Sequence, residues 1–230
     1  MEKKLDKIKS VYRKFMPVWI KVRVNRLRGY AVYNDYNDQL RCIFVHIPKT
    51  AGTSMQESLF NYSHTGHCKW DVYKAENSQK FKDYYKFAFV RNPFDRLVSA
   101  YFYLRNGGRN EGDKAWSDKV LINYPTFEDF VMNWLNDYNI NTWNHFAPQS
   151  DYIFDKKNNQ QVDFIGKFEN INEDFKLVAR DLGLDSELSK VNKSDRTDYQ
   201  DYYNESMIKV VEKVYARDLD LLGYKYEYRK

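Results

Sequence analysis

The sequence predicts an α/β fold in which helices flank a mostly parallel central sheet. Three short apolar runs have the length and composition of buried strands, at residues 42–47, 85–90 and 162–165. Segments with helix-start signals separate these runs, and strands that alternate with helices are typical of parallel sheets. The chain has 230 residues, of which 43% are hydrophobic, so it is long enough to bury a single core.

Most of the expected helices begin at a recognisable N-terminal signal. Asn92 followed by a proline combines a good N-cap with the residue favoured at the first helical position. Thr126 and Asn170 each have an acidic residue three positions later, which is the spacing of a capping box. The expected helices begin near Thr53, Asn92, Thr126, Asn170 and Asn204. The polar segments 63–80 and 106–118 are expected to be loops.

Basic residues are concentrated at the N-terminus. The formal net charge is +5, and residues 1–28 contain ten Lys or Arg against two acidic residues. The rest of the chain holds 27 basic and 30 acidic residues, so its body is not basic and no nucleic-acid partner is expected. Residues 1–41 are therefore expected to form a basic N-terminal arm that precedes a single domain over residues 42–230.

Apolar residues recur in the arm at helical spacing, and two interpretations stay open. Residues 1–28 either lie as a basic amphipathic helix on an anionic membrane surface or pack on the domain. No apolar run reaches the roughly 20 residues of a transmembrane helix, and no signal peptide is evident. With two cysteines and no Cys/His cluster of metal-ligand spacing, we expect no disulfide framework and no metal site. We therefore expect a cytoplasmic protein, peripheral at the membrane on the first interpretation.

The segment from Pro48 to Ser54 has the features of an anion-binding turn. It lies between the first strand and a helix, and it carries Lys49, several hydroxyl groups and Gly52. Main-chain N–H groups and the dipole at a helix N-terminus favour anions. In a Walker A nucleotide loop the lysine follows the glycines, whereas here Lys49 precedes Gly52. The sequence thus predicts a phosphate-like ligand held in an unusual way.

A second anion site is expected where the second strand ends. Arg91 follows this strand, and Ser99 lies about two turns along the next helix. A guanidinium fork with a nearby hydroxyl suits a terminal phosphate. Arg91 has an alternative partner in Asp95, and Arg96 is expected to be structural or on the surface. Because ligands of parallel sheets bind beyond the carboxyl ends of the strands, both motifs belong to one edge of the sheet.

Together the two motifs resemble those of the sulfotransferases that use 3′-phosphoadenosine-5′-phosphosulfate (PAPS). The similarity is to the carbohydrate sulfotransferase branch, which includes heparan sulfate 2-O-sulfotransferase and bacterial relatives, and it runs from about residue 42 to the end. Segments 145–149, 162–170 and 218–224 also look like family segments. The resemblance implies a P-loop-like three-layer sandwich, a sulfotransferase domain over residues 42–230, and PAPS as a cofactor that requires no metal.

The resemblance also implies a role for each part of the motifs. Lys49 is expected to be catalytic, because it neutralises the charge that grows on the leaving oxygen. Arg91 and Ser99 bind the 3′-phosphate. Lys193 and Arg196 either close over the nucleotide or form a solvated cluster. The phosphosulfate end is expected to be held by Lys49, Thr50, Ala51, Gly52, Thr53 and Ser54.

A histidine suits the removal of the acceptor's hydroxyl proton, because its usual pKa lies near neutrality. The resemblance points to His67, which follows Gly66 between the two motifs. The residues expected on the acceptor side are His64, His145 and Gln149. Either histidine of that set can replace His67 as the base, and Glu57 is a carboxylate alternative. His46 lies within the first strand and is expected to be structural.

The sequence therefore predicts a PAPS-dependent O-sulfotransferase that moves a sulfuryl group in line to a hydroxyl of a carbohydrate or glycoconjugate. One alternative is a sulfotransferase for a small alcohol, phenol or tyrosyl group. A P-loop-like kinase and a non-catalytic anion-binding module are the others. The order of Lys49 and Gly52 favours PAPS over ATP, and a polyphosphate would need one continuous cradle rather than two separated sites.

Overall fold

Three parallel strands form the centre of the molecule. The computed structural model describes residues 17–27, 31–61, 66–189 and 196–229. The strands are β1 (Cys42–Phe44), β2 (Tyr85–Val90) and β3 (Phe164–Lys167), in the order β1-β2-β3. Both neighbouring pairs are parallel, so the predicted α/β fold with a parallel sheet is confirmed.

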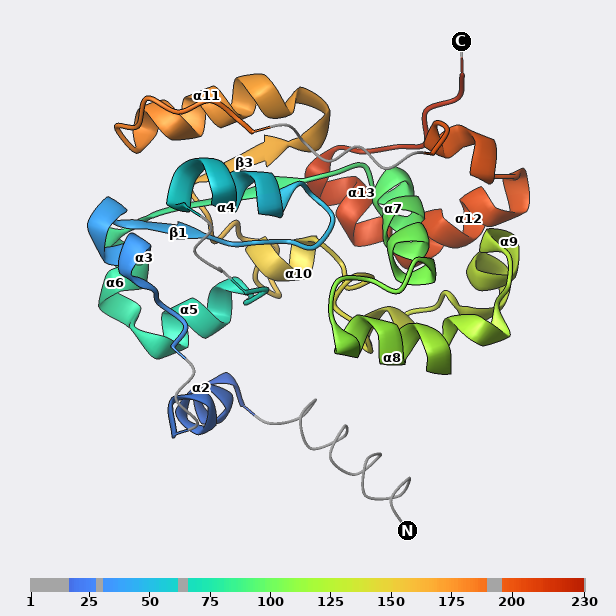
Figure 1. The fold of residues 1–230 in the computed structure, drawn as a ribbon, viewed down its shortest axis with the longest axis horizontal. Coiled ribbons are helices and arrows are strands. Elements are labelled where there is room, and N and C mark those ends of the chain that lie inside the picture. The colour runs from blue at the N-terminus through green and yellow to red at the C-terminus, as the bar shows by residue number, and fades with distance from the viewer. Residues whose placement is uncertain (1–16, 28–30, 62–65, 190–195, 230) are drawn as a thin grey trace.

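Helices cover both faces of this sheet, which gives three layers (Figure 1). One layer consists of α3 (Asp35–Leu40), α4 (Gly52–Phe60) and α11 (Ile171–Asp181). The other consists of α5 (Trp70–Glu76), α6 (Ser78–Asp83), α10 (Ser150–Ile153) and the end of α13 (Ala216–Leu222). Phe44 and Phe89 pack in the first core, and Ile43 and Ala88 pack in the second. Adjacent strand residues therefore serve opposite faces, as the pleat requires.

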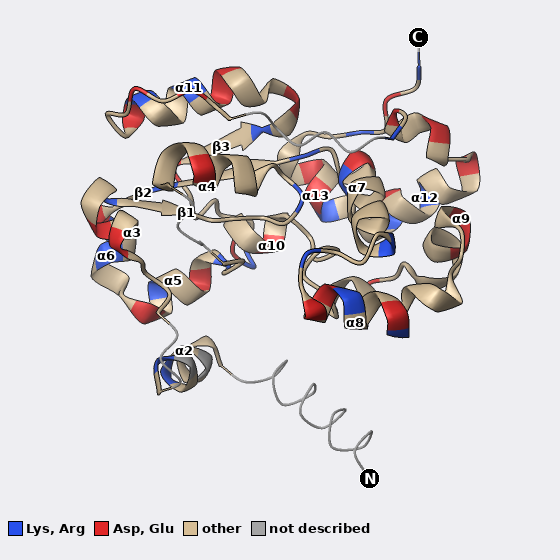
Figure 2. Cartoon of the chain, viewed as in Figure 1, with Lys and Arg blue, Asp and Glu red and all other residues tan. Residues whose placement is uncertain are grey.

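A third core lies beside the sheet, to its right in Figure 1, where helices pack on one another around Phe130 and Phe146. Its helices are α7 (Pro93–Arg105), α8 (Glu111–Lys119), α9 (Phe127–Asp129), the π-helix Phe130–Trp134 and α12 (Glu205–Val214). Short 3-10 helices lie at Leu121–Asn123, Asn139–Asn141, Phe168–Asn170 and Tyr199–Tyr202. Acidic and basic residues mix along the outer helices, as the red and blue segments of α8 illustrate (Figure 2).

The prediction of loops is wrong for two segments, because both contain helices. Residues 63–80 include α5 and the start of α6, and residues 106–118 include most of α8. The caps are asparagines: Asn77 accepts hydrogen bonds from the first turn of α6, and Asn110 accepts one from the N–H of Asp113 in α8. These short helices present few apolar residues, so their periodicity is weak, and capping asparagines are equally common in turns.

The third strand also differs from its expected end. Gly166 lies inside β3 and not after it. A Cβ atom at Gly166 would lie 2.4 Å from the ring of Phe89 on the neighbouring strand. The glycine therefore makes room for an aromatic side chain within the sheet.

Part of the expected N-terminal arm packs on the domain. The helix α2 (Val18–Leu27) lies against α5, with Val22 buried. In α3, Tyr36 stacks on Phe60 at 4.1 Å between ring centroids, and the side chain of Asn37 donates a hydrogen bond to the carbonyl of Cys42. The expected amphipathic face at residues 1–16 lies outside the described residues. In the described part of the chain, no helix is both long and apolar enough to cross a membrane.

A buried carboxylate joins the last helix to the segment after residue 145. Asp218 in α13 is fully buried and accepts hydrogen bonds from the main-chain N–H groups of Gln149 and Ser150, at 2.7 and 2.8 Å. Burial raises the pKa of Asp218, while these hydrogen bonds act in the opposite direction. The contact fixes the start of α10, and with it the polar residues on either side.

Replacing Asp218 with alanine is expected to lower the free energy of unfolding by about 3 kcal/mol, because two buried N–H groups lose their acceptor. Asp220→Ala on the same helix is the matched control, since Asp220 is exposed. Urea denaturation of both variants measures the difference. Equal stabilities would contradict the structural role of Asp218.

Candidate active site

The turn between β1 and α4 has an unusual backbone. Lys49 and Ala51 adopt left-handed φ values of 72° and 65°, although neither is glycine. Each such residue costs on the order of 1–3 kcal/mol, and such strain clusters at functional sites. Left-handed residues in tight turns turn successive main-chain N–H groups toward one point, where an anion can bind. Sequence patterns missed this feature, because nothing in Lys-Thr-Ala identifies left-handed residues.

Arg96 holds this turn in place. It is buried, with 2% of its surface exposed, and its guanidinium donates hydrogen bonds to the carbonyls of Pro48 and Ala147, at 3.0 and 2.9 Å. The structural role expected for Arg96 is therefore observed. Thr50 also supports the turn, because its hydroxyl is buried and donates to the carbonyl of Ile47 at 2.9 Å. The expectation that the Thr50 hydroxyl faces the ligand needs correction, since Ile47 already occupies it.

Gly52 is required by a close contact. A Cβ atom at Gly52 would lie 1.8 Å from Nε2 of His46, so only glycine lets the first turn of α4 approach this ring. The His46 ring is buried, and its Nδ1 lies 3.3 Å from Nε2 of Gln56. His46 thus has the packing role expected for it, although its ring also reaches the cavity described below.

The second motif forms a cationic group at the end of β2. Arg91 stacks on Phe168, 4.0 Å from the ring centroid, and its guanidinium pairs with Asp95 at 2.7 Å. Arg196 pairs with the other oxygen of Asp95. The two guanidinium groups therefore meet at one carboxylate. This arrangement confirms the alternative partner of Arg91, and it brings Arg196 to the site from far along the chain.

Gln149 supports Arg91 from behind. It is fully buried, its side-chain oxygen accepts from the N–H of Arg91 at 2.9 Å, and its amide nitrogen donates to the carbonyl of Arg91 at 2.7 Å. The expectation that Gln149 binds the acceptor therefore needs correction. Both ends of its amide are used by the main chain of Arg91, so Gln149 positions a cofactor-side residue.

One cavity of about 720 Å³ contains both motifs. Its volume lies within the usual range of small-molecule sites. Predicted residues that line it are Lys49, Ala51, Gly52, Thr53, Ser54, His67, Arg91, Ser99, His145 and Arg196. Thr50 and Gln149 are not among its lining residues. Glu57 is not either, and it accepts a hydrogen bond from Ser189. His64 and Lys193 lie outside the described residues.

Two histidines face this cavity with defined protonation. Nδ1 of His67 lies 3.1 Å from the carbonyl of His46, which can only accept, so Nδ1 carries the proton and Nε2 is the acceptor. Nε2 of His145 lies 3.1 Å from a carboxylate oxygen of Asp113 and donates to it. The two rings are 6.3 Å apart. Burial lowers the pKa of His145 to about 4, although Asp113 acts in the opposite direction.

Lys49 is held over an aromatic ring. Its ammonium nitrogen lies 3.7 Å from the ring centroid of Tyr103 in α7, a cation–π contact. Burial, followed by the charges of Arg91, Arg109 and Arg196, lowers the pKa of Lys49 to about 7. The site therefore gathers several positive groups around Lys49, a setting that favours an anionic ligand.

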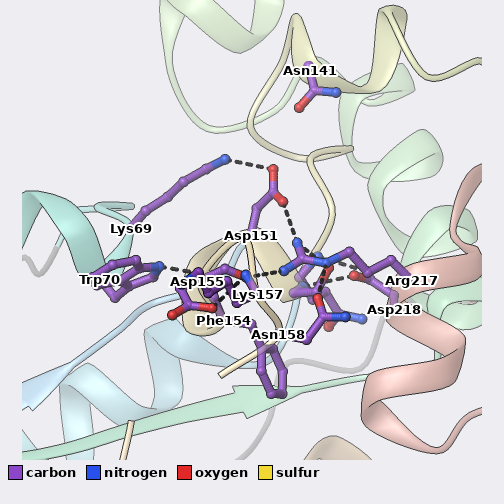
Figure 3. Close-up of polar contacts among 12 residues, drawn as sticks. Lys69, Trp70, Asn141, Asp151, Phe154, Asp155, Lys157, Asn158, Arg217 and Asp218 are labelled. Atoms are coloured by element: carbon purple, nitrogen blue, oxygen red, sulfur yellow. Dashed lines mark hydrogen bonds and ion pairs between the residues drawn. The ribbon is translucent and has the colours of Figure 1, made fainter. Parts of the chain in front are cut away.

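The residues that follow His67 belong to a polar network with α10 and α13 (Figure 3). Lys69 pairs with Asp151 at 2.9 Å, and Arg217 pairs with the other oxygen of Asp151 at 2.9 Å. The indole N–H of Trp70 donates to the carbonyl of Phe154 at 3.1 Å. These contacts bind residues 69–70 to α10 and α13, and they limit where His67 can lie.

The residues of the cavity suit an anionic ligand. The strained turn with Lys49 offers one group of donors and the guanidinium pair of Arg91 and Arg196 offers another, and Arg91 also donates to the carbonyl of Lys49 at 3.3 Å. Aromatic and histidine side chains line the same cavity, and they offer stacking and proton transfer.

The sequence model of the Sulfotransferase family matches residues 34–225. This match covers most of the chain, and the protein therefore belongs to the Sulfotransferase family. It begins before the expected boundary at residue 42 and includes α3, which agrees with the packing of α3 on the sheet.

Two relatives show different degrees of coverage. An uncharacterized protein of Archaeoglobus fulgidus is 29% identical over 133 residues, which is 57% of this chain and 95% of that protein. Carbohydrate sulfotransferase 12 of Xenopus laevis is 27% identical over 175 residues, 63% of this chain but only 41% of the frog protein. The chain thus spans less than half the length of the frog enzyme.

Replacing Lys49 with methionine is expected to stabilise the ligand-free protein, by on the order of 5 °C in Tm. The folded protein disfavours the charged ammonium, because its pKa falls from 10.5 to about 7. The stability that Lys49→Met gains over the wild type is therefore largest below about pH 7, and it shrinks as the pH rises toward 10.5. Thermal unfolding between pH 6 and 10 measures it, with exposed Lys114→Met as the control. An equal or lower Tm at pH 6 would contradict this account of Lys49.

Proposed function

We propose that this protein is a PAPS-dependent O-sulfotransferase that transfers a sulfuryl group to a hydroxyl of a carbohydrate or glycoconjugate. The observation that carries the proposal is a cavity lined by two groups of cations, Lys49 at the strained turn and Arg91 with Arg196 after β2, in a member of the Sulfotransferase family. PAPS has a reactive phosphosulfate and a separate 3′-phosphate, so it needs two such groups. The similarity to a carbohydrate sulfotransferase of Xenopus laevis supports a carbohydrate acceptor.

At the reactive end, Lys49 and the turn around it are proposed to hold the phosphosulfate. Main-chain N–H groups from Ala51 to Ser54 lie at the N-terminus of α4, where anions are favoured. The ammonium of Lys49 supplies positive charge where the leaving oxygen becomes negative during in-line transfer. This stabilisation is electrostatic and set up in advance by the fold, so it requires no metal.

At the other end, Arg91 and Arg196 are proposed to bind the 3′-phosphate together with Ser99. Both guanidinium groups line the cavity, so a bound phosphate would replace Asp95 as their partner. Phe168 stacks on Arg91 and limits its rotamers. Lys193 stays a prediction for this end of the site.

His67 is proposed as the base that accepts the hydroxyl proton. Its Nδ1–H is bonded to the main chain, so Nε2 is the nitrogen with a lone pair. His145 lies in the same cavity and is proposed on the acceptor side. The role of His64 on the acceptor side stays a prediction.

The acceptor class and the location of the protein remain proposals. A small alcohol, phenol or tyrosyl acceptor is the alternative, and it would use the same cofactor residues. A cytoplasmic location, with residues 1–28 in contact with an anionic membrane, rests on the sequence prediction alone.

Adenosine 3′,5′-bisphosphate (PAP), which keeps both phosphate ends, is expected to raise the Tm of the protein. A ligand that binds only the folded state stabilises by about 2.7 kcal/mol at one hundred times its Kd. Thermal unfolding with PAP is compared with ATP plus Mg²⁺ under the same conditions. Stabilisation by ATP with Mg²⁺ but not by PAP would refute the proposed function and favour a kinase.

Two variants are expected to separate binding from chemistry. Arg91→Ala should weaken PAP binding by about tenfold or more, because a charge-assisted phosphate contact is lost. His67→Ala should bind PAP like the wild type but lose turnover by at least about a hundredfold. Calorimetry measures PAP affinity, and transfer of labelled sulfate from PAPS to a polysaccharide panel measures turnover. Wild-type turnover in His67→Ala would remove His67 as the base.

A further inference from the structure

A buried carboxylate outside both anion-binding motifs binds the tyrosine that lies under Lys49. Asp113 is in the first turn of α8, with 3% of its surface exposed. Its side chain accepts three hydrogen bonds: from the hydroxyl of Tyr103 at 2.7 Å, from the amide of Asn110 at 2.9 Å and from Nε2 of His145 at 3.1 Å. Such a set of donors indicates an ionised carboxylate.

Two of the groups bound to Asp113 interact with Lys49, namely Tyr103 and His145. The ring of Tyr103 lies under the ammonium at 3.7 Å, and the rings of Tyr103 and His145 are 5.0 Å apart. Tyr103 also accepts the N–H of Arg109 through its hydroxyl, which binds the next loop to the same point. Asp113 thus fixes both the aromatic surface under Lys49 and the histidine beside it.

Asp113 is the acidic group among the described residues that act on the pKa of Lys49. The titratable groups that act on Lys49 or contact it are Arg91, Arg109, Arg196, Asp113, Tyr103 and His145. Asp95 lies in the same cavity, but Arg91 and Arg196 both pair with it.

We propose that Asp113 is a positioning residue of the sulfuryl-transfer reaction: it orients Tyr103 and His145 around Lys49 and supplies the negative charge that keeps Lys49 cationic. The effect of Asp113 on sulfuryl transfer rests on the proposed function. Its effect on the charge of Lys49 exists in the ligand-free protein and does not rest on it. Neither anion-binding motif includes Asp113, which lies in a segment that the sequence predicted to be a loop.

Asp113 also sets the tautomer of His145. Since the carboxylate accepts from Nε2, Nδ1 of His145 carries a lone pair, and it has no hydrogen-bond partner in the described part of the chain. A buried acceptor without a donor costs free energy. Asp113 therefore leaves Nδ1 of His145 as a buried acceptor without a donor from the residues that the structure describes.

The test compares Asp113→Asn with Asp118→Asn, which removes an exposed carboxylate from the same helix. Acetic anhydride labels only uncharged amines, so the pH dependence of Lys49 labelling in the ligand-free protein, read by mass spectrometry, reports its protonation. Removal of the facing negative charge is expected to shift the labelling midpoint by about one pH unit to lower pH in Asp113→Asn. The midpoint of Asp118→Asn is expected to equal that of the wild type.

An unchanged midpoint in folded Asp113→Asn would overturn the proposal. If that variant does not fold, the tautomer of His145 in the wild type decides, by nitrogen-15 NMR: a proton on Nε2 supports the proposal and a proton on Nδ1 overturns it. Turnover of Asp113→Asn is expected to fall about tenfold or more. The labelling and NMR measurements use no cofactor, so a protein that fails to bind PAP refutes the proposed function without deciding the role of Asp113.

Discussion

The candidate site depends on how the buried carboxylate of Asp218 holds the chain at Gln149 and Ser150. From this fixed point, Gln149 grips the main chain of Arg91, and Asp151 pairs with Lys69 close to His67. Just before it, the carbonyl of Ala147 accepts from Arg96, which also holds Pro48 in the strained turn. One segment therefore connects both anion-binding motifs and the segment that carries His67 through direct polar contacts.

These contacts hold a cluster of cations in place around the cavity. Lys49, Arg91, Arg109 and Arg196 face one cavity, and burial works against the charge of Lys49. Such a cluster destabilises the ligand-free fold, and the surrounding hydrogen bonds and packing offset it. When an anion binds, the positive groups stabilise this anion without rearrangement, because the fold already holds them together.

Local sequence patterns predicted much of the framework and part of the site. The three apolar runs became the three strands, and the turn at Pro48–Ser54 and the helix at Asn92 lie where the patterns placed them. The helices in segments 63–80 and 106–118 were missed, because α5, α6 and α8 have weak periodicity, and α6 and α8 begin at asparagine caps. Gly166 was read as a strand end, although its neighbour across the sheet explains it.

The sequence by itself determined the strand–turn–helix motifs, since their signals come from residues only a few positions apart. The tertiary structure alone decided the environment of those motifs. Gln149 binds the main chain of Arg91, which is 58 positions away in the sequence, and Asp113 binds His145, which is 32 positions away. Such contacts have no periodicity in the sequence, because they depend on how separate helices pack. The physical reason is that hydrogen bonds between distant residues are formed by the fold, while strands, caps and turns are encoded locally.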